Sequence, residues 1–327
     1  MSQYNVPILL ITFNRPTHTR KVLEAILAQQ PANLYVFRDG ARRDNEVDKV
    51  KCAEIEKVVD DAVKQLSPQT VLHTNYQAVN LGCGAGPATA FKWFFDNVEY
   101  GITMEDDCLP HPDFFPYCEE LLLRYKEQPQ LAFVNATLYK NVWQCGDASY
   151  GFSHYKVSGA WAAWRRTWEN YDIDIKNINP WKLRRKVKQL TNNPAEADWW
   201  FFKCREVKAD SNKHYWDYQM QMHLFMNDKI SIHPCVNLIS NIGFDAEGTH
   251  TMDNHDGRGD LPTYPIMPLK HPKEISIDLE MDARSFAKVM PTNERNRRKQ
   301  FIYKLMATGG KLSKAMIKAY KKIKHDK

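Results

Sequence analysis

The feature that most constrains the fold is a continuous apolar run close to the start of the chain, from Val6 to Phe13. No charged side chain interrupts this run, and such a strand is typical of a parallel sheet that helices cover on both faces. The polar segment 14–17 ends the run. The residues after it place four apolar side chains on one face of a helix, namely Val22, Leu23, Ile26 and Leu27.

The same alternation continues to about residue 107. Strands are predicted at Asn33–Phe37, Thr70–His73 and Tyr100–Met104, and helices at about 45–66 and 88–97, with a Gly-rich turn at 82–86. Further strands are expected at 131–136 and 230–232, helices at 180–190, 195–208 and 217–227, and loops over 245–292. This order predicts an α/β, Rossmann-like fold, with a mostly parallel sheet flanked by helices and a less regular second half.

Charge is distributed unevenly along the chain. The whole sequence has a formal net charge of +6, but residues 294–327 hold 12 Lys and Arg against 2 Asp and Glu, which leaves the rest at −4. In this tail, apolar residues share one face of a predicted helix that lysines surround, namely Leu312, Met316, Tyr320 and Ile323. The pattern is typical of a helix on an anionic membrane surface, and a solvated basic helix is the alternative. No nucleic-acid recognition motif accompanies the charge, so no nucleic-acid partner is expected.

Cysteine use and hydropathy bear on the compartment. The seven cysteines are odd in number and none has C-x-x-C spacing, so we expect reduced thiols, with neither a disulfide framework nor a structural zinc site. No segment reaches the roughly 20 apolar residues of a membrane-spanning helix. The first apolar run also lacks the basic leader of a signal peptide. A cytoplasmic protein is predicted, soluble or peripheral on the inner face of a membrane.

Polar side chains follow three of the predicted strands, as Asn14-Arg15, Arg38-Asp39 and Glu105-Asp106-Asp107. Ligands of open parallel sheets bind beyond the carboxyl ends of the strands, although loops that begin there are polar in any case. Carboxylates suit Mn²⁺ or Mg²⁺, which complete their coordination with phosphates. The three acids therefore predict a metal and phosphate centre, with a solvated acidic turn before Pro110 as the alternative.

The Gly-rich segment 82–86 invites comparison with nucleotide-binding loops. Pro87 stands where G-x-G-x-x-G needs its last glycine, and the chain contains no G-K-[ST]. The segment predicts either a loop that approaches a ligand or a tight entry into a helix.

The acidic segment Glu105-Asp106-Asp107-Cys108-Leu109-Pro110-His111-Pro112-Asp113-Phe114-Phe115 resembles the E-D-D-L-x-x-x-P-D-F-F stretch of N-acetylglucosaminyltransferase I and its relatives. More of the chain is similar to bacterial nucleotide-diphospho-sugar transferase-like proteins. The similar segments span roughly residues 6 to 250 and are Ile11–Pro16, Phe37–Gly40, Asn80–Gly82, Gly159–Arg166, Trp216–Gln219 and Asn237–Phe244. The resemblance implies a GT-A fold and transfer of a sugar from a nucleotide diphosphate-sugar, with UDP as the favoured nucleotide.

The resemblance also implies roles for single positions. Asp107 would bind Mn²⁺ or Mg²⁺, with Glu105 and Asp106 beside it on the donor side. Arg15 would contact the phosphates and Asp39 would pair with uracil. Residues 1–292 would form one GT-A domain, with a nucleotide-sugar half at 1–130 and an acceptor half at 131–292, followed by the basic tail at 293–327.

Asp217 is the predicted catalytic base, both from the resemblance and from the chemistry. An inverting transfer needs a carboxylate on the acceptor side that takes the hydroxyl proton, away from any metal that serves the leaving group. Asp217 lies 110 positions after Asp107, directly after Trp216. The alternative is that Asp217 only caps the helix predicted at 217–227.

Eight of the nine tryptophans lie between residues 143 and 216. Aromatic faces line many ligand sites, whereas most buried tryptophans only pack in a core. Trp161 and Trp216 are predicted to face the acceptor, and the others to pack.

Two rival functions remain beside the transferase. The segment 250–260 contains His250, Asp253, His255 and Asp256, and it is interpreted as a second metal site, a lid over the donor or a solvated loop. Combined with Glu105–Asp107, it would suit a metal-dependent hydrolase of nucleotide-sugars or phosphoesters. A non-catalytic nucleotide-sugar- or glycan-binding protein is the other rival. The interpretation we favour is an inverting, metal-dependent hexosyl- or N-acetylhexosaminyltransferase, acting on a surface polysaccharide or a lipid-linked acceptor.

Overall fold

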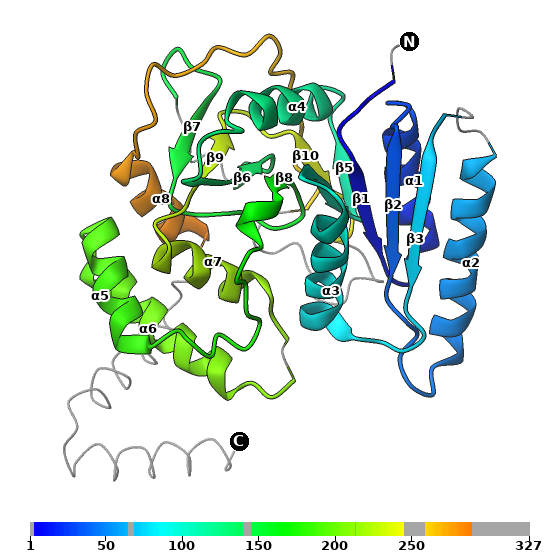
Figure 1. The fold of residues 1–327 in the computed structure, drawn as a ribbon, viewed down its shortest axis with the longest axis horizontal. Helices are drawn as coiled ribbons and strands as arrows, with labels where there is room; N and C mark the ends of the chain where they lie inside the picture. The colour runs from blue at the N-terminus through cyan, green and yellow to red at the C-terminus, as the bar shows by residue number, and fades with distance from the viewer. Residues whose placement is uncertain (1–2, 65–68, 140–144, 213, 245–258, 290–327) are drawn as a thin grey trace.

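The structure is a computed structural model that describes residues 3–64, 69–139, 145–212, 214–244 and 259–289. Within these ranges the chain forms an eight-stranded sheet, a two-stranded sheet and helices on both faces of the larger sheet (Figure 1). In chain order the elements are β1 (Ile8–Thr12), α1 (Pro16–Leu27), β2 (Asn33–Arg38), α2 (Glu46–Val63), β3 (Val71–Tyr76), α3 (Gly82–Asn97), β4 (Tyr100–Glu105), β5 (Cys108–Pro110), α4 (Phe114–Arg124), β6 (Leu131–Asn135), β7 (Tyr150–Ser153), β8 (Ala160–Trp164), α5 (Pro180–Thr191), α6 (Pro194–Ala209), α7 (Asp217–Met226), β9 (Ile230–Pro234), β10 (Ile239–Asn241) and α8 (Leu279–Val289).

The large sheet has the strand order β3-β2-β1-β4-β8-β6-β9-β7. The first four strands of this order pair in parallel. Beyond them β8 is antiparallel to both of its neighbours, β6 and β9 are parallel, and β7 is antiparallel to β9. The predicted α/β fold with a mostly parallel sheet is therefore confirmed. Because one sheet runs through both halves of the chain, residue 130 does not separate two independent cores.

The first strand shows why this sequence forms a sheet covered on both faces. All five residues of β1 are buried, and successive side chains of a strand point to opposite faces. Ile8 and Leu10 pack in a cluster with residues of α1, α2 and α4. Leu9 and Ile11 pack on the other face, in a cluster with residues of α3 and α7.

A third cluster joins α5, α6 and α7 with Phe286 of α8. The prediction of loops throughout 245–292 is therefore wrong for Leu279–Val289, which forms α8. The sequence around it is rich in Gly, Pro, Asp and His, and this composition hid a short amphipathic segment whose Met281 and Phe286 are buried.

Two further expectations are corrected. The segment 82–86 is not a turn before a helix but the first part of α3, which runs on through Pro87. Cys145 and Cys235 form a disulfide, with their Cα atoms 6.0 Å apart, where reduced thiols were expected. Neither the number of cysteines nor a local motif reveals this pairing, because the two residues lie 90 positions apart in the sequence.

Candidate active site at the switch point of the sheet

The central feature of the site is the switch point of the sheet, at the carboxyl ends of β1 and β4. Strand order reverses here, since β2 and β3 lie on one side of β1 and β4 lies on the other, and open α/β sheets bind ligands at such a switch point. The residues that follow the two strands meet across it: Arg15 Nη1 donates to Asp107 Oδ2 at 3.0 Å. The predicted convergence of Arg15 with the acidic segment is thus observed in the structure.

The backbone behind this ion pair explains part of the motif pattern. β5 pairs with β10, and the Ile242 amide donates to the Asp107 carbonyl at 2.8 Å. A Cβ atom on Gly243 would collide with Asp107 Oδ2 and lie 2.5 Å from Arg15 Nη1. Glycine is required at this position because the chain passes directly against the ion pair.

The acids Glu105, Asp106 and Asp107, named here the switch-point acids, carry more negative charge than their surroundings balance. Burial raises the pKa of Glu105, and the charges of Asp107 and Asp106 raise it further. Burial also raises the pKa of Asp106, against the effect of Arg15. Burial lowers the pKa of Arg15, but Asp106 and Asp107 outweigh that effect and raise it. A cationic ligand at this point would therefore be favoured.

Within the described ranges, no group of three or more His, Cys, Asp or Glu side chains is arranged to hold a metal ion. Asp107 Oδ2 accepts from Arg15 Nη1, so Asp107 could bind an ion only through its other oxygen, beside the carboxylates of Glu105 and Asp106. Mg²⁺ commonly takes only one or two carboxylates and fills its remaining positions with waters and substrate phosphates. The acids therefore suit an ion that arrives with a phosphate ligand better than a cage made by the protein alone.

Asp39 is engaged by the chain itself. Its Oδ1 accepts from the amides of Gly40 and Leu81, each at 2.8 Å, and its Oδ2 accepts from the Gly82 amide and Asn80 Nδ2, each at 3.0 Å. A carboxylate has about four acceptor positions, so these bonds fill it. They fix the start of α3, which is why that helix begins at Gly82, and they leave no acceptor position for the predicted contact with uracil.

Asp217 is the first residue of α7, so the predicted helix begins where expected. The residue before it, Trp216, stands at the cap position, and no side chain makes a capping bond there. Asp217 Oδ1 nevertheless accepts from the Tyr218 amide at 2.9 Å, so its side chain binds an amide of the first turn, and the alternative role of Asp217 at the start of α7 stays open. Its side chain is half-buried.

Lys156 is a functional candidate that the sequence did not reveal. Burial lowers its pKa to about 8, whereas the charges of Asp217 and Glu105 raise it. Its Nζ lies 4.2 Å from the centre of the Trp216 ring and donates to Ser158 Oγ at 3.1 Å. Lys156 thus connects the switch-point acids electrostatically with the predicted base. It stands in no motif, and only the folding of a distant segment brings it here.

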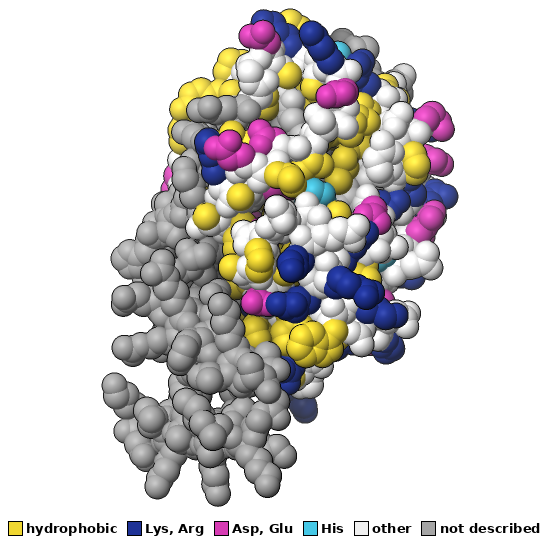
Figure 2. All heavy atoms as spheres, turned by 90° about the vertical axis from the view of Figure 1, so that its left-hand side faces the viewer, with side chains coloured by type: hydrophobic (Ala, Val, Ile, Leu, Met, Phe, Trp, Pro, Cys, Tyr) yellow, Lys and Arg dark blue, Asp and Glu magenta, His cyan; other side chains and the backbone are white. Residues whose placement is uncertain are grey.

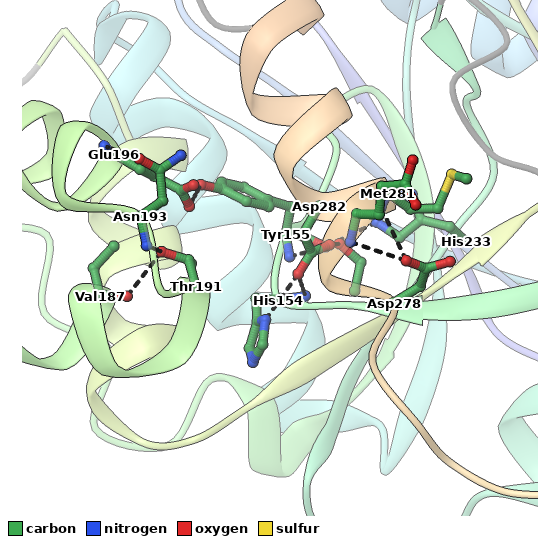
Figure 3. Close-up of polar contacts among 12 residues, drawn as sticks. His154, Tyr155, Val187, Thr191, Asn193, Glu196, His233, Asp278, Met281 and Asp282 are labelled. Carbon is green, nitrogen blue, oxygen red and sulfur yellow. Dashed lines mark hydrogen bonds and ion pairs between the residues drawn. The ribbon is translucent and has the colours of Figure 1, made fainter.

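A buried set of polar residues holds the segment that carries Lys156; we name Ser153, His154, Tyr155, Glu196 and Asp282 the anchor network (Figure 3). Asp282 of α8 accepts from Ser153 Oγ at 2.5 Å, from the His154 amide at 3.1 Å and from His154 Nδ1 at 2.8 Å. The Tyr155 hydroxyl donates to Glu196 of α6. Figure 3 shows Tyr155 reaching Glu196 on one side while His154 faces Asp282 on the other.

The two tryptophans predicted on the acceptor side are core residues. Trp161 is fully buried and packs against Phe91, Phe133 and Trp168. Trp216 is also buried, and its ring contacts the side chain of Lys156. A sugar cannot reach Trp161, so the prediction for that residue is wrong. Trp216 contributes to the site through its contact with Lys156.

A cleft of about 740 Å³ lies beside α3, along the segment 165–173. Its lining includes Trp93, Trp168 and Tyr171, and it does not include the switch-point acids. The Tyr171 hydroxyl donates to the carbonyl of Trp216 at 3.0 Å, which ties this wall of the cleft to the residue before Asp217. The segment 250–256 and the tail lie outside the described residues, so the predictions made for them stay predictions.

No protein-family model matches the chain, and no curated protein does. Among solved structures, a UTP-bound UGPase from Acinetobacter baumannii is 8% identical, with 70% of this chain and 88% of that chain covered and a TM-score of 0.34. A UDP-glucose pyrophosphorylase complexed with UDP-glucose is 9% identical, with 68% and 89% covered and a TM-score of 0.31. A 4-diphosphocytidyl-2C-methyl-D-erythritol synthase from Anaerococcus prevotii is 11% identical, with 50% and 75% covered and a TM-score of 0.30. Similarity at this level identifies neither an activity nor a ligand, so a function has to be argued from the side chains of the site.

Proposed function

We propose that the protein is a glycosyltransferase that moves a sugar from a nucleotide diphosphate-sugar, with UDP as the favoured nucleotide, to a glycan or lipid-linked acceptor. The observation that carries the proposal is the Arg15–Asp107 pair at the switch point of the sheet, set among acids whose charge is not balanced. A diphosphate accompanied by a divalent cation supplies both the negative charge that Arg15 can bind and the positive charge that the acids lack.

The donor would lie over the ends of β1 and β4. Arg15 would bind a phosphate oxygen. The ammonium group of Lys156 would lie between the donor and the base, Asp217. Glu105, Asp106 and Asp107 would hold Mn²⁺ or Mg²⁺, which supplies charge neutralisation to the leaving diphosphate. Asp39, whose carboxylate is filled, would shape the nucleotide pocket by fixing the start of α3 instead of pairing with the base.

Asp217 would act on the acceptor side. Its carboxylate takes the proton of the acceptor hydroxyl while that oxygen bonds to the anomeric carbon and the bond from this carbon to the diphosphate oxygen breaks. Attack from the face opposite the leaving group inverts the anomeric centre. The cleft lined by Trp93, Trp168 and Tyr171 is the proposed path of the acceptor, because Tyr171 is bonded to the backbone beside Asp217.

The donor half of the proposal is tested by calorimetry with a panel of nucleotide-sugars, first with Mn²⁺ and then with a chelator. We expect one UDP-sugar to bind only with metal, and Asp107→Ala to lose that binding. Asp61→Ala is the matched control, because Asp61 pairs with Lys64 on the surface of α2. Absence of binding across the panel, or equal binding with the chelator, would remove the donor site.

The chemical half is tested with Asp217→Asn. We expect kcat to fall by about 10²- to 10⁴-fold, the range for loss of a general base, while metal-dependent binding of the donor stays as in the wild type. Asp210→Asn is the control, since Asp210 accepts from the His214 amide on the loop just before α7. Full activity of Asp217→Asn would take Asp217 out of the mechanism. Donor hydrolysis that needs no acceptor would favour a hydrolase.

A further inference from the structure

The outer face of α5 is the most basic surface element of the described chain. Its twelve residues include five cations and no acid, and the cations are Lys182, Arg184, Arg185, Lys186 and Lys188. The opposite face is apolar, with Leu183 and Val187 buried in the cluster that α5 shares with α6 and α7. The helix is thus amphipathic. Its apolar side packs against α6 and α7, and its cationic side faces outward.

A tryptophan stands on the cationic side. Trp181 is 57% exposed, although its ring centre lies only 4.4 Å from that of Phe201 of α6. Positions four and seven residues after it, Arg185 and Lys188, lie on the same face of the helix. Exposed tryptophan is uncommon on a soluble surface, and next to cations it is typical of a membrane interface, where the ring lies at headgroup level.

Only some of the cations are matched by acids. Arg184 pairs with Asp198 and Lys186 pairs with Asp228. For Lys182, Arg185 and Lys188 no ion pair is found within the described residues. Figure 2 views this side of the molecule, and Lys and Arg side chains gather there around an exposed hydrophobic area in the lower half.

We propose that Trp181, Lys182, Arg185 and Lys188 form a membrane-docking face that lies on anionic lipid headgroups. The cations give charge complementarity to such a surface, and Trp181 gives the apolar anchor that a purely electrostatic contact lacks. Among the described residues no helix is long and apolar enough to cross a bilayer, so the contact is one on the membrane surface.

The order of the elements along the chain also favours membrane contact on the side of the molecule that carries α5. α8 contacts α5, and the sequence that follows α8 carries 12 Lys and Arg against 2 Asp and Glu over residues 294–327. The basic sequence therefore follows an element that contacts α5 on its buried, apolar side. Nucleic acid is the rival occupant, but single-stranded nucleic acid is bound through several aromatic platforms in a basic groove, whereas this face offers one exposed aromatic ring on a convex helix.

The inference does not depend on sugar transfer, and it is tested with the full chain and vesicles of 70% phosphatidylcholine and 30% phosphatidylglycerol, against vesicles of phosphatidylcholine alone. The wild type should co-sediment with the anionic vesicles only. The triple variant Lys182→Glu, Arg185→Glu, Lys188→Glu should bind the anionic vesicles at least about tenfold more weakly than the wild type, because each cation near an anionic surface contributes to binding. Trp181→Ala should weaken binding by a smaller factor without changing the salt dependence.

The matched control reverses three exposed cations on the other side of the molecule, Arg20→Glu, Lys21→Glu and Lys57→Glu, on α1 and α2. This variant has the same net charge as the first and should bind the vesicles nearly as the wild type does. Equal losses in the two triple variants, or no loss in the α5 variant, would overturn the docking face. So would an α5 variant that keeps vesicle binding but loses binding to a 30-nucleotide RNA. Nucleotide binding and the thermal transition, measured on the same samples, separate this result from misfolding and from failure of the proposed transfer.

Discussion

Two groups of buried acids in this molecule differ in how well their charges are met. In the anchor network, both oxygens of Asp282 accept hydrogen bonds from Ser153 or His154. Glu196 accepts from Tyr155 through Oε1, while its Oε2 is buried without a hydrogen-bond partner among the described residues. Among the switch-point acids, Asp107 has one arginine partner and Asp106 accepts a long bond of 3.4 Å from the Phe13 amide. Three acids there share two nearby cations.

The difference separates structure from function. A buried carboxylate whose bonds are complete stabilises the segments that supply its donors, and removing it leaves those donors unmet. Buried carboxylates with too few partners cost free energy, and such a cost persists in folded proteins chiefly at sites where a ligand offsets it. Asp282, whose two oxygens are both bonded, should therefore matter for stability, and the switch-point acids for binding. The following variants test that division.

The largest effect on stability is expected from Asp282→Asn. The amide group of asparagine would place a donor against Ser153 or His154, which are themselves donors to Asp282, and the charge of the acceptor would be lost. We expect the free energy of unfolding to fall by about 3–5 kcal/mol, the range for breaking a buried charged contact, in a urea titration followed by circular dichroism.

Asp278→Asn is the control for that variant, because Asp278 lies in the same part of the network view (Figure 3) but is exposed and only caps α8 through the amides of Glu280 and Met281. Its loss should be about 1 kcal/mol or less. Donor binding at low temperature should survive in both variants. If Asp282→Asn lost donor binding while keeping its stability, the division between the two groups of acids would fail.

The positions of the switch-point acids follow from short-range patterns. The strands β1 and β4 are continuous apolar runs, each ends in a polar segment, and parallel strands bring those ends to the same edge of the sheet. That reasoning needs only the sequence around residues 6–15 and 100–107. It correctly places Arg15 beside the acids. A separate local pattern, that of the helix predicted at 217–227, gives the start of α7 at Asp217.

The features that the sequence did not reveal depend on contacts between distant segments. Lys156 reaches the site only because Asp282, 126 positions later, and Glu196 hold the residues before it. The start of α3 at Gly82 depends on a carboxylate from Asp39, so a local search for a capping residue finds none. Trp161 is enclosed by rings from three other segments of the chain, and an assignment to the acceptor that rested on the number of tryptophans could not foresee that burial.

Within the anchor network Glu196 is the acid with an unmet oxygen, and Glu196→Gln tests what its charge costs. Burial raises the pKa of Glu196 to about 7, and Asp282 adds to that effect. An unfolded glutamate has a pKa near 4.3, so the folded state holds the proton more tightly, and the charged form is penalised in the folded protein. The penalty is absent below the unfolded pKa, grows as pH rises, and is complete above pH 7.

The neutral amide of Glu196→Gln keeps an acceptor for Tyr155 and removes this penalty. We expect the variant to be more stable than the wild type by about 2–3 kcal/mol at pH 8 and nearly equal to it at pH 4.5, measured by denaturant titration across this range. Glu206→Gln, at an exposed position of α6 that pairs with Lys203, should change stability little at either pH. A variant that was destabilised equally at both pH values would show that the charge of Glu196 is required in the fold.

The smallest effect is expected at Lys156, and it concerns binding. Burial lowers its pKa to about 8, so the folded protein loses this positive charge as pH rises through 8, well before a free lysine would. If the charge supports the donor's diphosphate, the affinity should fall by about tenfold per pH unit above 8. Below that point affinity should rise with pH, because the pKa of Glu105 and of Asp106 lies above its ordinary value and a cation competes with their protons.

Lys156→Arg keeps its charge throughout, so calorimetry should show the alkaline fall disappear while the acidic rise remains. Lys64→Arg, at an exposed position at the end of α2 that pairs with Asp61, should leave both limbs unchanged. An unaltered alkaline fall in Lys156→Arg would assign that limb to another group and reduce Lys156 to a packing partner of Trp216.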